Sequence, residues 1–321
     1  MATGGDAQKV NEIPDHRFSD VIAAAQSLAT MRTAVVNPVD GPSILGAFAA
    51  YEADLIEPVL IGPSHRIRSA AASAGVDVGR FEVIDVQSSV EAAEVAVATA
   101  ADGAVRSIMK GAIHTDELLR PIMARRSGLR TSRRMSHVFV LEVPAWDRHL
   151  LITDAVINVA PDLDAKRDIV QNAIDLALTL GVVQPKVAVL AAVETVTPEL
   201  PATIDGAGLA MMNQRGQITG GVVDGPLALD LAVSAGAAAT KGVVGSSVAG
   251  HADVLVVPDL NAGNILAKAL EHVCGGIAAG VVLGAQVPIA LTSRSDGAHA
   301  RLASSALAVL LASARMKESL S

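Results

Sequence analysis

Cationic side chains crowd one short stretch of an otherwise acidic chain. They occur at Lys110, Arg120, Arg125, Arg126, Arg130, Arg133 and Arg134. Guanidinium groups bind phosphate oxygens through paired hydrogen bonds, so this stretch could form a phosphate pocket. A solvated helix face or loop is the commoner role of any single arginine. The cluster therefore indicates a region where phosphate could bind, without showing which of these residues would bind it.

Lys110 and Arg120 are the strongest candidates within it, because the segment MKGAIHTDELLRP predicts a strand, a glycine turn and a helix. Lys110 would end the strand, and open α/β sheets bind ligands at the carboxyl ends of their strands. Thr115 could cap the helix, whose N-terminus attracts anions. His114 could titrate beside that ligand, although a plain loop histidine is the simpler interpretation.

A hydroxyl, a guanidinium and a carboxylate emerge together after the apolar strand in LTSRSDGAHAR, as Ser293, Arg294 and Asp296. Such groups can hydrogen-bond a substrate, neutralise developing charge and accept a proton. Helix capping by Ser293 or Ser295, with Asp296 in the first turn, is the structural explanation of the same residues. The two roles are compatible, so capping does not exclude catalysis.

Polar turns follow several other predicted strands. TDAVINVAPDL carries Asp154 and Asn158, ITGGVVDGPLALD carries Asp224, and VPDLNAGN carries Asp259, Asn261 and Asn264. Each turn alone is weak evidence, since Asp, Asn and Gly are ordinary turn residues. Their recurrence at strand ends predicts a shared polar cleft.

The elements that must position these groups alternate along the chain. Strands are predicted at 33–37, 59–62, 82–86, 107–109, 186–192, 254–257, 280–283 and 289–292, with helices at 43–53, 90–101, 164–180 and 297–317. This alternation predicts a parallel sheet with right-handed crossovers. Strands at 137–144 and 150–154 are too close for a parallel pair and predict an antiparallel hairpin, where the chain would cross between two lobes.

Composition limits the possible functions. The 321 residues are 51% hydrophobic, and the net charge of −8 disfavours nucleic-acid binding. A single cysteine, Cys274, excludes an intrachain disulfide and suits the cytosol. The N-terminus lacks the pattern of a signal peptide, and the apolar stretch 277–291 is too short to cross a membrane. Walker, GxGxxG, metal-ligand and GxSxG patterns are absent from the sequence, so no metal is assigned.

Several motifs together resemble the phosphate acetyl/butyryltransferase family. They include KGAIHTDELLRP, MSHVFVLEVP, PATIDGAGL, RGQITGGVVDGPLALD, VPDLNAGNIL and VPIALTSRSD, in the family's order from Lys110 to Asp296. PATIDGAGL and LTSRSD look closer to the butyryl branch. The resemblance implies a two-lobed α/β/α fold like that of isocitrate and isopropylmalate dehydrogenases, divided as 1–134 with 285–321 and 135–284. It also implies an interlobe active site and a cytoplasmic homodimer.

The same resemblance assigns roles by position. Ser293 and Arg294 match the family's catalytic Ser-Arg pair, and Arg120 matches the arginine that grips phosphate. The aspartate proposed as base in the acetyl branch lies seven residues after that serine, which is Ala300 here. Asp296 is the nearest carboxylate, and His299 is the reserve candidate.

The implied reaction is transfer of a short acyl group between coenzyme A and phosphate. It would proceed directly within a ternary complex, with coenzyme A as a substrate and with no permanently bound cofactor, metal or acyl-enzyme. Two alternatives stay open. An NAD-dependent decarboxylating dehydrogenase of the same fold would require a nicotinamide site and a metal site. A non-catalytic acyl-CoA sensor would bind coenzyme A without turnover.

Overall fold

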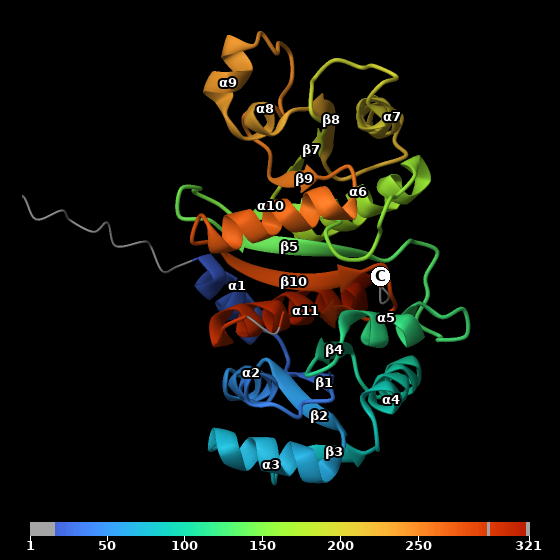
Figure 1. Ribbon diagram of the computed structural model, residues 1–321, viewed down its shortest axis with the longest axis vertical. Coiled ribbons are helices and arrows are strands. Elements are labelled where there is room, and N and C mark those ends of the chain that lie inside the picture. The colour runs from blue at the N-terminus through green and yellow to red at the C-terminus, as the bar shows by residue number, and fades with distance from the viewer. Residues whose placement is uncertain (1–16, 294–295, 319–321) are drawn as a thin grey trace, which may run out of the picture.

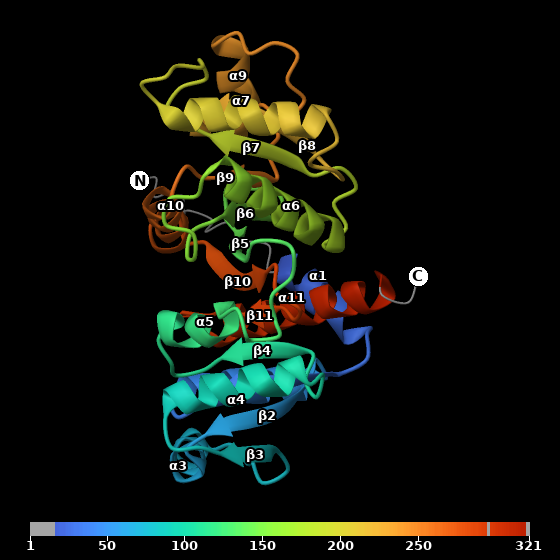
Figure 2. The same ribbon diagram turned by 90° about the vertical axis from the view of Figure 1, so that its right-hand side faces the viewer.

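One mixed sheet runs through the length of the molecule. The computed structural model describes residues 17–293 and 296–318. The strand order is β3-β2-β1-β4-β11-β10-β5-β6-β9-β7-β8 (Figure 1), and helices cover both faces of the sheet (Figure 2). This is the layered α/β architecture that the alternating sequence pattern predicts.

The five strands at one end of the sheet are parallel and come from both ends of the chain. They are β1 (Met31–Val36), β2 (Ile56–Gly62), β3 (Glu82–Asp85), β4 (Ser107–Lys110) and β11 (Ile289–Ala290). In the β4–β11 pair, Ile289 lies opposite Ile108. The C-terminal region therefore completes a sheet that the N-terminal region begins.

The other six strands include two that run antiparallel at the centre. The six are β5 (Ser136–Glu142), β6 (Leu150–Thr153), β7 (Lys186–Leu190), β8 (Val222–Leu227), β9 (Val254–Val256) and β10 (Ile277–Leu283). β5 pairs antiparallel with both β10 and β6, which confirms the predicted hairpin, while β6 to β9 form a second parallel block. β5 and β10 thus join the two parallel blocks.

Side chains alternate across the sheet, so each strand contributes to cores on both faces. One face packs against α1 (Arg17–Gln26), α2 (Gly41–Glu52), α3 (Ser64–Ala74), α6 (Leu163–Thr179), α7 (Pro201–Gln214) and α11 (Ala298–Glu318). The other packs against α4 (Ser89–Ala101), α5 (Thr115–Met123), α8 (Leu229–Val233), α9 (Ala235–Thr240) and α10 (Leu260–His272). Within the described ranges, none of these helices is long and apolar enough to cross a bilayer.

The two ends of helix α6 show how neighbouring residues determine where a helix begins and ends. The Asp162 side chain caps its N-terminus by accepting a hydrogen bond from the Ala165 amide at 2.8 Å. Gly181 follows its end with a left-handed φ of 85°, a conformation that glycine adopts without strain. The predicted helix at 164–180 is confirmed to within one residue at each end.

Two sequence expectations are wrong in detail. Asp224 was expected in a turn before Pro226, yet it lies within β8 and pairs with Ala188 of β7. β11 ends at Ala290 rather than at residue 292. The backbone passes close to its neighbour at Gly221, because a Cβ there would lie 2.7 Å from the Pro185 carbonyl oxygen.

Candidate active site

A cavity of about 340 Å³ lies between the start of α5 and the middle of α10. Figure 2 shows both helices on the same side of the sheet. The cavity is lined by Lys110, Ile113, His114, Thr115, His137, Phe139, Val156, Asn264, Lys268, Leu291, Thr292 and Ser293. These residues come from both parallel blocks and from the central β5 strand. The cavity therefore brings together five of the predicted site residues: Lys110, His114, Thr115, Asn264 and Ser293.

The cationic side of the cavity is built on β4 and α5. Lys110 ends β4 as predicted, and only 4% of its surface is exposed. His114 is the residue that precedes α5, and Thr115 is the first helical residue. The expectation that Thr115 caps the helix is therefore wrong. Lys268 of α10 adds a second ammonium group that sequence reasoning missed.

Ser293 is held by a network that one buried arginine organises. The Ser293 amide donates to Asp296 Oδ2 at 2.6 Å. Arg301, which is 3% exposed, donates to Thr292 Oγ1 at 3.1 Å, to the Ser293 carbonyl at 2.8 Å and to the Asp296 carbonyl at 3.2 Å. Arg301 was also missed by sequence reasoning, because it looks like any polar helix residue. The predicted catalytic Arg294 lies outside the described residues.

Asp296 lies in the loop before α11, where its carboxylate contacts the Ser293 amide, rather than in a helical turn. α11 begins at Ala298, so the expected position in the first helical turn is wrong. Burial raises the pKa of the Asp296 carboxyl above its usual 3.8; the nearby Glu271 adds to this, while the hydrogen bond from Ser293 opposes it. His299 is exposed, with its ring 6.1 Å from that of Phe18, and is not among the described residues lining the cavity.

Asp154 and Asn158 hold the turn after β6, and both are buried. Asp154 accepts hydrogen bonds from the amides of Val156 and Ile157 at 2.9 and 3.0 Å, and from Asn158 Nδ2 at 2.6 Å. Burial raises the pKa of Asp154, and these hydrogen bonds oppose that rise. Both residues thus support the cavity wall at Val156 rather than line the cavity.

The remaining predicted polar residues divide between two places. Asp259 caps α10 by accepting from the Ala262 amide at 3.0 Å, which positions Asn264 one turn further along the helix. Asn261 is exposed in the first turn of α10. Asp224 lines a different cavity of about 600 Å³, next to β8 at the far edge of the sheet. The expectation of one cleft shared by all the polar turns is therefore wrong for Asp224.

Arg120 is on α5 but is not among the described residues lining the cavity. Its side chain is 79% exposed and lies 3.6 Å from the Asp116 carboxylate, one helical turn earlier. The structure therefore does not place the Arg120 side chain in the cavity that holds Lys110.

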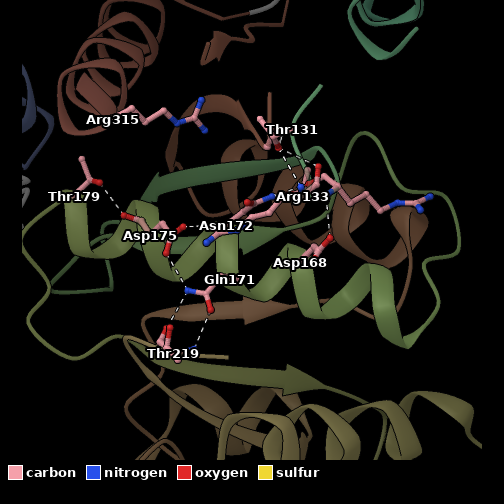
Figure 3. A network of polar contacts seen from close by, with 12 residues as sticks. Thr131, Arg133, Asp168, Gln171, Asn172, Asp175, Thr179, Thr219 and Arg315 are labelled. Atoms are coloured by element: carbon pink, nitrogen blue, oxygen red, sulfur yellow. Dashed lines mark hydrogen bonds and ion pairs between the residues drawn. The ribbon is translucent and has the colours of Figure 1, made fainter. Parts of the chain in front are cut away.

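Two arginines of the cationic stretch belong to a polar network on α6 (Figure 3). Arg133 pairs with Asp175, and the Arg134 amide donates to Asp168 Oδ2 at 3.0 Å. Arg134 Nε also donates to Asn158 Oδ1 at 2.6 Å. Arg133 lines a third cavity of about 570 Å³ between α6 and α11, on the other face of the sheet. The cationic stretch is thus divided between the two faces of the sheet.

Across the described residues, 17–293 and 296–318, no three His, Cys, Asp or Glu side chains are grouped so that they could hold a metal ion.

Comparison with known proteins gives consistent matches. Residues 86–309 match the family described as "Phosphate acetyl/butaryl transferase". The chain is 53% identical over 299 residues to a phosphate acetyltransferase of Rhizobium meliloti, covering 93% of this chain and 94% of the relative. It is 39% identical over 295 residues to a phosphate butyryltransferase of Clostridium acetobutylicum, covering 92% and 98%. A branched-chain phosphotransacylase from Enterococcus faecalis V583 superposes with a TM-score of 0.75 at 28% identity, covering 88% of this chain and 99% of that chain.

Relatives named for acetyl and for butyryl transfer both match nearly the whole chain, so the expected closeness to the butyryl branch is not decided. Four of the motifs contribute residues that line the cavity: KGAIHTDELLRP, MSHVFVLEVP, VPDLNAGNIL and VPIALTSRSD. The motif PATIDGAGL, on α7, and the segment that carries Asp224 contribute none of the described residues that line it. The chain belongs to the phosphate acetyl/butyryltransferase family of acyltransferases.

Proposed function

We propose that this chain reversibly transfers a short acyl group between coenzyme A and inorganic phosphate, by direct attack within a ternary complex at the 340 Å³ cavity. The proposal rests on the observation that the cavity wall has a polar part and an apolar part. Lys110, Lys268 and Ser293 supply ammonium and hydroxyl groups, while Ile113, Phe139 and Leu291 supply apolar surface. Phosphate oxygens suit the first set, and a short hydrocarbon chain suits the second.

In this mechanism the thiol of coenzyme A attacks the carbonyl carbon of the acyl phosphate. The thiol proton passes to a base, the carbon–oxygen bond to phosphate breaks, and the thioester and free phosphate remain. Asp296 is the proposed base, acting directly or through water, and its raised pKa makes it a stronger proton acceptor than an ordinary carboxylate. Ser293 donates a hydrogen bond to the thiolate or to the tetrahedral intermediate, and Lys110 neutralises the leaving phosphate.

Three further proposals concern the whole protein. The division into lobes 1–134 with 285–321 and 135–284 is supported by the strand order, because each range supplies one parallel block. A homodimer is supported by the family resemblance alone. A cytoplasmic location and the absence of a permanently bound cofactor rest on the same resemblance, and the single cysteine supports the location.

The function is tested by incubating the purified chain with acetyl, propionyl or butyryl phosphate and coenzyme A, and measuring thioester formation. Turnover is expected with at least one of these substrates, and it should survive dialysis against EDTA. Coenzyme A binding without turnover would instead favour the sensor. Reduction of NAD with a 2-hydroxy acid, restored by a divalent ion after EDTA, would favour the dehydrogenase.

The family resemblance alone gives Arg120 a phosphate contact, since this exposed side chain is not among the described residues lining the cavity. On that basis Arg120→Ala is expected to raise the KM for phosphate about tenfold or more, because one charged hydrogen bond contributes roughly 1.5–3 kcal/mol. Its exposed ion pair with Asp116 contributes little to stability, so the melting temperature should hardly change. Arg68→Ala, at an exposed arginine of α3, is the matched control. A phosphate KM equal to that of the control would show that Arg120 does not bind phosphate.

A further inference from the structure

His137 is a polar side chain fully enclosed in the cavity wall. It lies on β5 with 0% of its surface exposed. Among the residues that the structure describes, neither Nδ1 nor Nε2 has a hydrogen-bond partner. Its ring packs edge-on against Phe139, with centroids 4.4 Å apart, and both residues line the cavity. Buried polar groups are nearly always paired, so two unsatisfied nitrogens at one site require an explanation.

The neighbouring strand leaves space for this imidazole. Gly280 of β10 lies on the same face of the sheet, and a Cβ there would approach His137 Nε2 to 2.8 Å. Leu, Met or Phe would fill the same space without leaving polar atoms unsatisfied. Packing alone therefore does not account for a histidine at this position.

The charge state of His137 limits what it can do. Burial lowers its pKa to about 3, so the ring is neutral near pH 7. The facing residues of β10, Gly280 and Val282, carry no charge. So weak a base cannot take the proton of a thiol with a pKa near 8.5. A neutral imidazole can still donate one N–H hydrogen bond, as such rings do toward carbonyl groups in other enzymes.

The position of the ring indicates which substrate atom would accept that hydrogen bond. Lys110 and Lys268 supply the charge that phosphate needs, whereas Phe139 and Leu291 form the apolar wall beside His137. The acyl carbonyl is the only polar group of the acyl chain that the apolar wall would adjoin. It also gains negative charge as the thiol attacks.

We propose that His137 donates a hydrogen bond from its neutral imidazole to the acyl carbonyl oxygen, and so stabilises the tetrahedral intermediate. This inference rests on the proposed acyl transfer at the same cavity. Ser293 and His137 then contact the reacting carbonyl from different strands of the sheet.

The first test compares His137→Leu with His149→Leu. His149 is the matched control, because its Nε2 is also buried without a hydrogen-bond partner, with Glu142 Oε1 3.8 Å away, and it lines a separate cavity of about 310 Å³. His137→Leu is expected to lower kcat by roughly 10²–10³-fold, as removal of one oxyanion donor does, with the phosphate KM within about threefold of wild type. His149→Leu should keep wild-type kcat. His137→Asn, which retains an N–H donor, should recover part of the loss.

A His137→Leu variant with kcat within threefold of an active wild type would overturn the inference while leaving the proposed function intact. A wild-type chain without turnover on any acyl phosphate would overturn both. Should His137→Leu fail to fold, ¹⁵N-histidine NMR of the wild type provides the second test. A non-transferable acylphosphonate should move one buried imidazole N–H resonance downfield, and inorganic phosphate alone should not. An unmoved resonance with bound acylphosphonate would also overturn the inference.

Discussion

Replacing Asp296 by Asn is expected to lower kcat by roughly 10²–10⁴-fold, because the variant keeps an oxygen that can accept from the Ser293 amide but cannot take the thiol proton. The melting temperature should fall little. If Asp296 only shapes the turn, kcat should instead stay near the wild-type value while stability changes by about 1 kcal/mol or less. Steady-state kinetics with saturating acyl phosphate and coenzyme A separates the two outcomes.

The same variant has a predicted pH signature in stability. Because burial raises the pKa of Asp296 above 3.8, the folded chain binds that proton more tightly than the unfolded chain. Wild-type stability from this group is therefore fully present below 3.8 and is lost as the pH rises through the raised value. The Asn variant does not titrate there. Urea unfolding from about pH 4 to pH 7 should show the variant gaining stability relative to wild type as the pH rises.

Asp162→Asn is the control for the kinetic measurement. Asp162 likewise accepts a hydrogen bond from a backbone amide, that of Ala165, but it caps α6 and is exposed. Its substitution should leave kcat unchanged. An Asp296→Asn enzyme as active as Asp162→Asn would show that the base is another group, with His299 the next residue to substitute.

Arg301→Met is expected to destabilise the fold by about 3 kcal/mol or more and to lower kcat as well, since one buried and two part-buried acceptors lose the same guanidinium. The loop of Thr292, Ser293 and Asp296 would then lose the contacts that fix its geometry. We therefore infer that Arg301 positions Ser293 without contacting substrate.

The test for Arg301 separates positioning from stability. Arg315→Met, on the same helix, also removes a guanidinium that donates to a backbone carbonyl, that of Ala285. Measured well below both melting temperatures, kcat should fall only for Arg301→Met, and Arg301→Lys should recover part of it. Equal kcat values for the two Met variants would mean that Arg301 contributes stability alone.

The parts of the site that the sequence predicts well are those set by neighbouring residues. Lys110 ends its strand as expected, because the apolar pair Ile108 and Met109 before it and the glycine after it define that end locally. The β5–β6 hairpin follows from its short connection in the same way. Ser293 was correctly placed at the end of an apolar run.

The parts that it predicts poorly depend on contacts between distant segments. Asp296 was expected in the first turn of the last helix, yet that helix begins two residues later, and the burial that raises the pKa of Asp296 depends on the packing of distant segments. Asp224 was expected in the shared cleft, but strand order places β8 at the far edge of the sheet. His137 is visible in the sequence as a histidine in an apolar strand, and only the opposing strand shows that both nitrogens are enclosed.

The pairing of β11 with β4 has a consequence for how the protein is made. Ile289 and Ile108 are neighbours in the sheet although most of the chain separates them, and α11 covers α1 and α2 on the same side. A ribosome releases β5 to β10 before it releases β11 and α11. During synthesis the N-terminal strands therefore have an unpaired edge at β4. The apolar surfaces of α1 and α2 that α11 later covers are exposed during the same period. Until β11 and α11 have been made, that half of the nascent chain is the one most exposed to chaperones and to aggregation.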